Sequence, residues 1–344
     1  MAFLFKRDPK TPKTPQDLVR ALTDSVQKLD INNDNNKKYQ DDCARYLNQM
    51  KIILHGDDEN DPQPDQITLL AQEVHSGDCL YHLIYNLRKL DFDSRKDVVI
   101  LFSTLLRRQI GTTSNKSSPT AEYLVNNKPN IILMLMKGPE SHEIGLICGQ
   151  ILRDCIKYEN INRFILYHPT FWNFFKYVQI PIFEIATDSF TTLHDLLTSH
   201  KKLVAEFLAT NYDTFIIAFN KLIQSNNYVT KRQSVKLLND LLKKQNQTFL
   251  NKYFDDINNL KLIMLILSDK SKNLQREGFH VFKFFVVNPR RSQKVLDILV
   301  KNKENFIEFF NTFDIQGFHD PTLANERDYV LEQIKNLPDI ERIH

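Results

Sequence analysis

The chain has 344 residues, of which 42% are hydrophobic and 25% are charged, and its formal net charge at pH 7 is +3. These values are typical of a globular protein with a large core, and they exclude a chain that is disordered throughout. Basic and acidic side chains nearly balance, which excludes the strong overall field that recruits nucleic acid or an anionic membrane, so any partner surface must be local.

Glycine is scarce in this chain, at 8 residues. Tight β-hairpins need Asn-Gly or Asp-Gly turns, whereas long stretches rich in Leu, Ile, Phe and Lys between polar segments favour helices joined by loops. The composition therefore predicts an all-α fold. No window approaches about 18 uninterrupted apolar residues, so we expect a cytoplasmic protein with no membrane partner.

A string near the N-terminus imitates part of a calcium-binding EF-hand loop. It places Asp30, Asn32 and Asp34 at alternate positions, with Asp41 at the twelfth. The loop requires Gly at the sixth position, where Asn35 stands, and a bidentate Glu at the twelfth. We interpret the string as a solvated connection between helices and expect no metal.

Residues 56–66 and 111–120 have the composition of loops, rich in Asp, Asn, Ser and Pro. Apolar helical patterning resumes on both sides of each segment. We therefore interpret them as surface loops within one continuous array, not as linkers between domains.

Five long amphipathic helices are predicted along the chain. Capping boxes at 94–97 and 230–233 mark the first and the fourth, and the third and fifth cover 183–197 and about 272–287. The second carries a seven-position stripe. The stripe residues of the first, second and fourth helices are Val98, Leu101, Phe102, Leu105, Leu106; Ile144, Ile147, Cys148, Ile151, Leu152, Cys155, Ile156; and Val235, Leu238, Leu241, Leu242.

The five helical segments recur at a regular interval. Their starts, near residues 91, 140, 183, 227 and 269, are about 49, 43, 44 and 42 residues apart, close to the armadillo and HEAT periods of about 40 to 47. Shorter helical runs lie between them, at 171–178, 212–223 and 260–267. One such unit cannot bury its own apolar face, so stacked neighbours share a core and leave one concave ladder of equivalent helices.

The four cysteines, Cys43, Cys79, Cys148 and Cys155, include no CxxC pair, and two of them fall on an apolar stripe. Buried free thiols are expected from this pattern.

Signatures of catalysis are missing from the sequence. No GxxxxGK[ST], GxGxxG, HExxH or GxSxG string occurs, and His82, His194 and His280 lie within helical runs, where we interpret them as structural. We expect no enzyme activity and no cofactor, although a catalytic pair assembled from distant repeats is left open by the sequence.

Binding chemistry gathers on the predicted ladder. Tyr228, Arg232 and Lys236 recur every fourth residue and share one face of the fourth long helix, rotated from its core stripe. Phe183 lies one period, 45 residues, before Tyr228. Aromatic and arginine side chains dominate interface hot spots, so we predict a protein-binding face. The alternative is an ordinary solvated basic face together with a core phenylalanine.

Four strings resemble the mouse-protein-twenty-five family, also called calcium-binding protein thirty-nine, whose fungal members include the Hym-type proteins. The similarity covers nearly the whole chain, from LVRALTDSVQKL to about Phe313. The strings are DFDSRKDVVILFSTLLRRQIGT (91–112), FEIATDSFTTLHDLLTSHKKLVAEFL (183–208), NYVTKRQSVKLLNDLL (227–242) and DKSKNLQREGFHVFKFFVVNP (269–289).

The resemblance implies an armadillo-like, right-handed helical superhelix with a concave binding face. The repeat pattern itself predicts a continuous array at 91–301, with the less regular segments serving as capping helices at 1–90 and as a C-terminal cap and tail at 302–344. The resemblance also implies a non-catalytic scaffold that binds and allosterically activates a germinal-centre-type kinase or pseudokinase. In fungi this role belongs to polarised growth and cell separation, with recruitment to those sites. We expect the protein alone to be monomeric.

The resemblance also assigns residues to sites. Phe183, Tyr228, Arg232 and Lys236 correspond to the family's concave kinase-binding face. Met264 and Lys301 correspond to a C-terminal pocket that receives a Trp-Glu/Asp-Phe tail of the partner, because a thioether can fit an aromatic ring and an ammonium can pair with the acidic residue.

This chain departs from the family pattern in two places. Gln245 stands where the animal proteins have an arginine, and the loop at 113–119 is longer. The loss of the cation at Gln245 favours a fungal-type kinase partner. A different class of function, a helical-repeat adaptor for peptide or RNA cargo, would require a long basic groove, whereas the charges are mixed along the chain.

Overall fold

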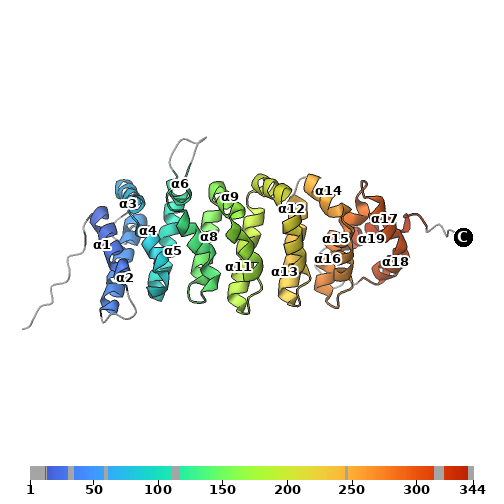
Figure 1. The fold of residues 1–344 in the computed structure, drawn as a ribbon, viewed down its shortest axis with the longest axis horizontal. Helices are drawn as coiled ribbons and strands as arrows, with labels where there is room; N and C mark the ends of the chain where they lie inside the picture. Colours follow the sequence, from blue (N-terminus) through green and yellow to red (C-terminus); the bar gives the residue numbers. More distant parts are fainter. Residues whose placement is uncertain are drawn as a thin grey trace, which may run out of the picture. The chain divides into compact units, whose positions relative to one another are not determined.

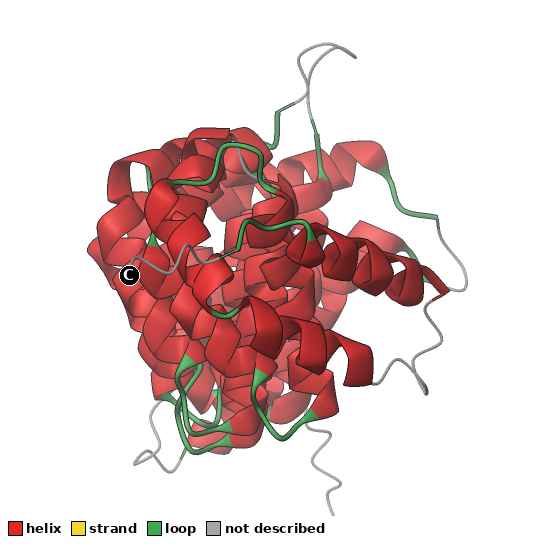
Figure 2. Cartoon of the chain, turned by 90° about the vertical axis from the view of Figure 1, so that its right-hand side faces the viewer, coloured by secondary structure: helices red, strands yellow, loops and turns green. Residues whose placement is uncertain are grey.

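The computed structural model describes residue 12 and residues 14–29, 35–57, 61–109, 117–244, 247–313 and 321–339. Within these ranges the regular structure consists of helices α1 to α19 and the short 3-10 helices η1 to η3. Figure 2 shows them as helices joined by loops. The predicted all-α fold is confirmed. The chain divides into two compact units, Met1–Ser199 and His200–His344.

The first unit contains α1 to α11. Their bounds are α1 (Pro15–Gln27), α2 (Asn36–His55), α3 (Pro64–Ser76), α4 (Cys79–Tyr85), η1 (Leu87–Lys89), α5 (Phe92–Arg107), α6 (Pro119–Asn126), α7 (Pro129–Met136), η2 (Gly138–Glu140), α8 (Gly145–Ile156), α9 (Glu159–Tyr167), η3 (Pro169–Asn173), α10 (Phe174–Tyr177) and α11 (Phe183–Thr198).

Helices α2, α5, α8 and α11 pack in succession within this unit, and we call them the first ladder (Figure 1). A polar contact joins each successive pair. Lys51 Nζ on α2 lies 2.8 Å from Asp97 Oδ1 on α5. Ser103 on α5 donates a hydrogen bond to Asp154 on α8. The apolar stripes lie in the core beneath these contacts, since Val98, Leu101, Phe102, Leu105 and Leu106 are all buried.

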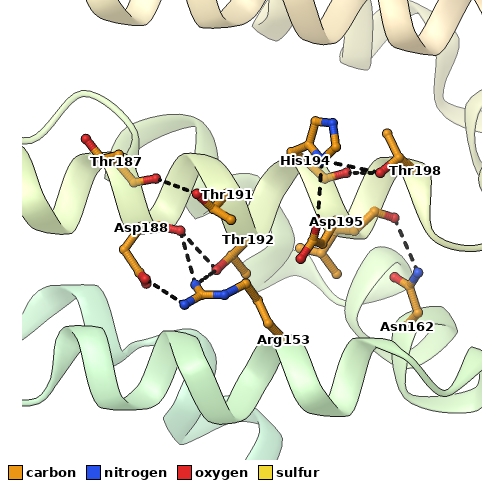
Figure 3. A network of polar contacts seen from close by, with 10 residues as sticks. Arg153, Asn162, Thr187, Asp188, Thr191, Thr192, His194, Asp195 and Thr198 are labelled. Carbon is orange, nitrogen blue, oxygen red and sulfur yellow. Dashed lines mark hydrogen bonds and ion pairs between the residues drawn. The ribbon is translucent and has the colours of Figure 1, made fainter.

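The contact between α8 and α11 is the most elaborate of these polar links (Figure 3). Arg153 Nη2 on α8 pairs with Asp188 Oδ1 on α11 at 2.7 Å, and Arg153 Nη1 donates to Thr192 Oγ1 at 2.9 Å. Gly149 makes room for the pair, because a Cβ there would lie 1.9 Å from Asp188 Oδ2. Both charged side chains are mostly buried, so this charge-assisted contact fixes the register of the two helices.

The start of α5 differs from the predicted capping box. Asp91 is the N-cap, and its Oδ1 accepts from Ser94 N at 2.8 Å. Ser94 lies in the first turn, where its hydroxyl donates to Asp91 Oδ2 at 3.0 Å. The capping assignment at 94–97 was therefore wrong by one turn, because an aspartate three residues earlier offers the better acceptor for the unpaired amides.

The second unit contains α12 to α19. Their bounds are α12 (Lys201–Ile223), α13 (Tyr228–Lys244), α14 (Gln247–Asp255), α15 (Ile257–Leu267), α16 (Lys272–Val287), α17 (Gln293–Lys301), α18 (Lys303–Thr312) and α19 (Pro321–Lys335).

Helices α13, α16 and α19 pack in succession within this unit and form the second ladder. Lys231 Nζ on α13 lies 3.5 Å from Asp269 Oδ2 just before α16, and Lys283 Nζ on α16 lies 2.6 Å from Glu326 Oε1 on α19. The unit therefore repeats the pattern of the first ladder, with an apolar core and a polar contact between neighbouring helices.

Of the two long helices predicted in this unit, one begins where it was predicted to begin and the other has a different N-cap. The fifth helix is confirmed at 272–287. In the fourth, Asn227 caps the helix, since its Oδ1 accepts from Val229 N at 2.9 Å and from Thr230 N at 3.2 Å. The predicted capping box at 230–233 was therefore wrong, although its core stripe of Val235, Leu238, Leu241 and Leu242 is buried as predicted.

The shorter predicted runs are helical. Residues 171–178 span η3 and α10, and 260–267 lie within α15. Residues 212–223 are the second part of α12, which is kinked at Asn211 with φ −111° and ψ 19°. The predicted run is therefore part of a longer helix that begins at Lys201.

All four cysteines are buried free thiols, as predicted. Burial raises the pKa of Cys43 to about 12 and that of Cys79 to about 11, so neither is a thiolate at neutral pH. The described residues contain no group of three or more His, Cys, Asp or Glu side chains that could hold a metal ion. None of their helices combines the length and apolar character needed to span a bilayer.

Several sequence features lie outside the described residues. These are Asp30, Asn32 and Asp34 of the EF-hand-like string, Gln245, and residues 113–116 of the longer loop. The division at 90/91 and 301/302 stays a prediction.

Candidate protein-interaction surface

Three of the predicted site residues lie together on α13. Tyr228 is the first residue of the helix and its side chain is 44% exposed. Its hydroxyl accepts a hydrogen bond from Ser271 Oγ, the N-cap of α16, at 3.2 Å. Arg232 follows one turn later and is partly exposed, and Lys236 another turn later and is exposed. We call Tyr228, Arg232 and Lys236 the α13 row.

Arg232 is held only loosely by its neighbours. Its Nη2 lies 3.9 Å from Glu277 Oε1 on α16, at the long end of an ion pair, and its side chain is 43% exposed. Its Nε is buried and has no acceptor among the described residues. A guanidinium presents five N–H donors in a fixed fork, so most of this capacity is available to a partner.

The neighbouring helix α16 adds no unpaired positive charge to this face among the described residues. Lys283 on α16 is engaged with Glu326, and His280 Nδ1 lies 3.8 Å from Glu326 Oε2. Burial, assisted by nearby Lys283, lowers the pKa of His280 to about 4, so the imidazole is neutral at pH 7. The positive charge therefore comes from lysine and arginine and does not vary near neutral pH.

Phe183 lies in the first unit, as the first residue of α11, and its ring is 63% exposed. The alternative that it is a core phenylalanine is therefore wrong. Pro181 precedes the helix by two residues, and Glu184 in the first turn favours a helix start at this point. Phe183 belongs to the first unit and the α13 row to the second.

The predicted C-terminal pocket residues lie on neighbouring helices of the second unit. Met264 on α15 is half-buried, and Lys301 is the exposed last residue of α17, which packs against α15. Leu265, beside Met264, is 68% exposed. Lys261, one turn earlier on α15, is exposed as well. Aliphatic side chains with a lysine one turn away on the same helix suit a peptide that carries both an aromatic and an acidic residue.

Sequence reasoning missed two exposed apolar side chains, Leu265 and Phe92. Phe92 is the first residue of α5, its ring is 67% exposed, and Lys96 Nζ lies 4.0 Å from the ring centroid. It takes the same first position in its helix as Phe183 and Tyr228 do in theirs. That recurrence at the starts of long helices was available in the sequence. Leu265 gave no such signal, because it sits in a run of apolar residues.

Comparisons with known proteins agree with this architecture. Residues 3–338 match the Mo25-like family. Calcium-binding protein 39-like of Mus musculus is 44% identical over 329 residues, covering 95% of this chain and 96% of that protein. Protein HYM1 of Saccharomyces cerevisiae is 38% identical over 353 residues, covering 99% of this chain and 86% of that protein.

Among solved structures, an engineered protein superposes with a TM-score of 0.51 at 14% sequence identity, over 94% of this chain and 72% of that chain. At this identity the likeness concerns the fold alone. The match over residues 3–338 and the two relatives are the stronger findings, and by them the chain belongs to the Mo25-like family.

Proposed function

We propose that this protein is a non-catalytic scaffold that binds a germinal-centre-type protein kinase or pseudokinase and activates it allosterically. Membership of the Mo25-like family and the all-helical fold support a scaffold or adaptor role with protein partners. The observation that carries the finer proposal is the α13 row, which offers an aromatic ring, a loosely held guanidinium and an exposed ammonium on one helix face. These are the side chains of interface hot spots.

Activation by such a surface needs no chemistry from the scaffold. A kinase domain exists in active and inactive arrangements, and a partner that binds the active one more tightly shifts the equilibrium by the difference in affinity. A tenfold preference corresponds to about 1.4 kcal/mol, which one well-packed aromatic or arginine contact can supply. The kinase is thereby stabilised in its active arrangement without any covalent step.

We further propose that Phe183 contributes to the same kinase contact from the first unit. Met264 and Lys301 then hold a Trp-Glu/Asp-Phe tail at the C-terminal pocket. A tail in the pocket would tether the kinase and raise the effective concentration of its catalytic domain at the α13 row. Without its partner the protein is a monomer in the cytoplasm, and in a fungal cell it serves polarised growth and cell separation.

The tail pocket is tested by a fluorescence-polarisation titration with a peptide ending in Trp-Asp-Phe. We expect saturable binding that Met264→Ala weakens at least about tenfold and Lys301→Ala weakens by less. The control is Ile217→Ala, which truncates an exposed aliphatic side chain on α12 of the same unit. Equal binding by the wild type and Met264→Ala would remove the pocket from the proposal.

A further inference from the structure

A cleft in the first unit brings together the end of α2, the start of α3 and the end of α5. Its volume is about 590 Å³, within the range of ligand sites. In the part of the chain that the structure describes, its lining includes Arg107, Arg108 and His55 and no carboxylate. The cleft therefore gathers two guanidinium groups on a concave surface of the first unit.

The two arginines enter the cleft from the last turn of α5. Arg107 is exposed. Within the described residues its guanidinium makes one hydrogen bond, in which Nε donates to Ser103 O at 3.1 Å. Arg108, the C-cap, has extended backbone angles that turn it toward α3, where its Nη2 donates to Thr68 Oγ1 at 2.9 Å. Neither guanidinium has an ion-pair partner in the part of the chain that the structure describes, in contrast to Arg153.

The opposite wall is the start of α3 at Pro64, where the N-cap residue Gln63 makes no side-chain capping hydrogen bond. Asp65 in the first turn already sets a carboxylate against the positive end of the helix dipole, so the two arginines carry the attraction for an anion. His55 Nε2 and Thr104 Oγ1, 3.1 Å apart, complete a polar rim.

The floor of the cleft is apolar. Leu54 is buried and Ile67 is half-buried, while Pro64, His55 and Arg107 are exposed. A small anion would leave the apolar floor uncovered and would be only partly enclosed, whereas a peptide could place an anionic group on the arginines and a neighbouring apolar side chain on Leu54 and Ile67. The charge and shape of the cleft thus fit a peptide better than a free ion.

We infer that this cleft binds a phosphorylated serine or threonine of a protein partner, with an apolar residue next to the phosphorylated one. A phosphate monoester carries close to two negative charges at pH 7 and offers oxygens that match the fork of an arginine in bidentate fashion. The inference concerns a second contact of the protein and does not depend on the α13 row or on the C-terminal pocket.

The test uses the full chain and fluorescein-labelled heptapeptides of degenerate sequence, with phosphothreonine fixed at the centre and leucine after it. The same peptide mixture with unmodified threonine is the comparison. We expect the wild type to bind the phosphorylated mixture at least about tenfold more tightly, and we expect Arg107→Gln with Arg108→Gln to abolish this preference. Arg163→Gln, which removes an exposed arginine elsewhere in the same unit, should retain it.

The single variant Arg107→Gln separates loss of binding from loss of folding. Arg107 is exposed, and the hydrogen bond that it makes within the described residues is to its own helix. It should lower the preference while the thermal unfolding curve stays unchanged. Equal binding of both mixtures by the wild type, or an unchanged preference in the double variant, would overturn the inference. Displacement of the peptide by inorganic phosphate or inositol hexakisphosphate at a similar concentration would overturn it too, since the ligand would then be a free anion.

Discussion

At the scale of single residues, the exposure of the α13 row follows from helical geometry. Positions four apart and rotated from an apolar stripe must face outward, and the stripe of α13 was evident in the sequence. The exposure of Phe183 could not be decided that way, because a phenylalanine at a helix start fits a core or a surface equally well. Only the folded chain shows where its ring lies.

Close packing at Gly138 gives a residue-scale prediction. A Cβ on Gly138 would lie 2.2 Å from Cys148 Cβ, which is fixed in the buried stripe of α8 and cannot move without its backbone. Gly138→Ala should therefore lower the free energy of unfolding by roughly 1–3 kcal/mol in urea titrations. Gly77→Ala is the matched control, since its nearest neighbour would be Glu73 O at an ordinary 3.6 Å. Equal stability of the two variants would refute the packing argument.

His280 predicts how stability depends on pH. Burial, helped by Lys283, lowers the pKa of the folded imidazole to about 4 from the ordinary value of 6.5. Between these values the unfolded chain binds a proton that the folded chain does not. The contribution of neutral His280 to the free energy of unfolding is therefore complete above pH 6.5 and is lost as the pH falls toward 4.

The measurement compares urea unfolding at pH 7 and pH 5. Between pH 7 and pH 5 the free energy of unfolding of the wild type should fall by on the order of 1–2 kcal/mol more than that of His280→Gln. His142→Gln, at an exposed position, should behave like the wild type. Carboxylates also titrate in this range, so the difference between the variants is the informative quantity. An identical pH dependence in His280→Gln would show that His280 does not contribute.

At the scale of elements, the existence and type of the long helices could be predicted, and their first residues could not. The apolar stripes predicted α5, α8 and α13, and the seven-position stripe of α8 leaves almost no strand alternative at that length. The predicted capping boxes at 94–97 and 230–233 were wrong because Ser or Thr three residues before an acidic or amide side chain is a frequent pattern that also occurs inside helices. Asp91 and Asn227, slightly upstream, are stronger acceptors.

The cap of α13 can be tested directly. Asn227→Ala removes the acceptor of two backbone amides and should lower the free energy of unfolding by about 1 kcal/mol. Gln233→Ala, which deletes the exposed partner in the predicted capping box, should have an effect below about 0.5 kcal/mol. If Gln233→Ala proved the more costly change in urea unfolding, the cap would lie at Thr230 after all.

At the scale of the whole molecule, the period of the repeats and the resemblance together predicted the all-α repeat fold and the family. Spacing alone could not predict which contacts join neighbouring helices. Pairs such as Arg153 and Asp188 lie 35 residues apart in the chain and meet only because Gly149 leaves room between α8 and α11. Nor could it reveal the cleft at Arg107, which is assembled from the ends of three helices.

The central claim is that the α13 row of this protein activates a kinase without chemistry of its own. Its most direct test is the initial rate of a purified germinal-centre-type kinase from the same organism, with saturating wild-type protein or with Arg232→Ala. Arg163→Ala, a similarly exposed arginine elsewhere, is the control. We predict that the wild type and Arg163→Ala raise the rate several-fold, whereas Arg232→Ala gives at most about a tenth of that activation with unchanged helix content. Full activation by Arg232→Ala would contradict the account.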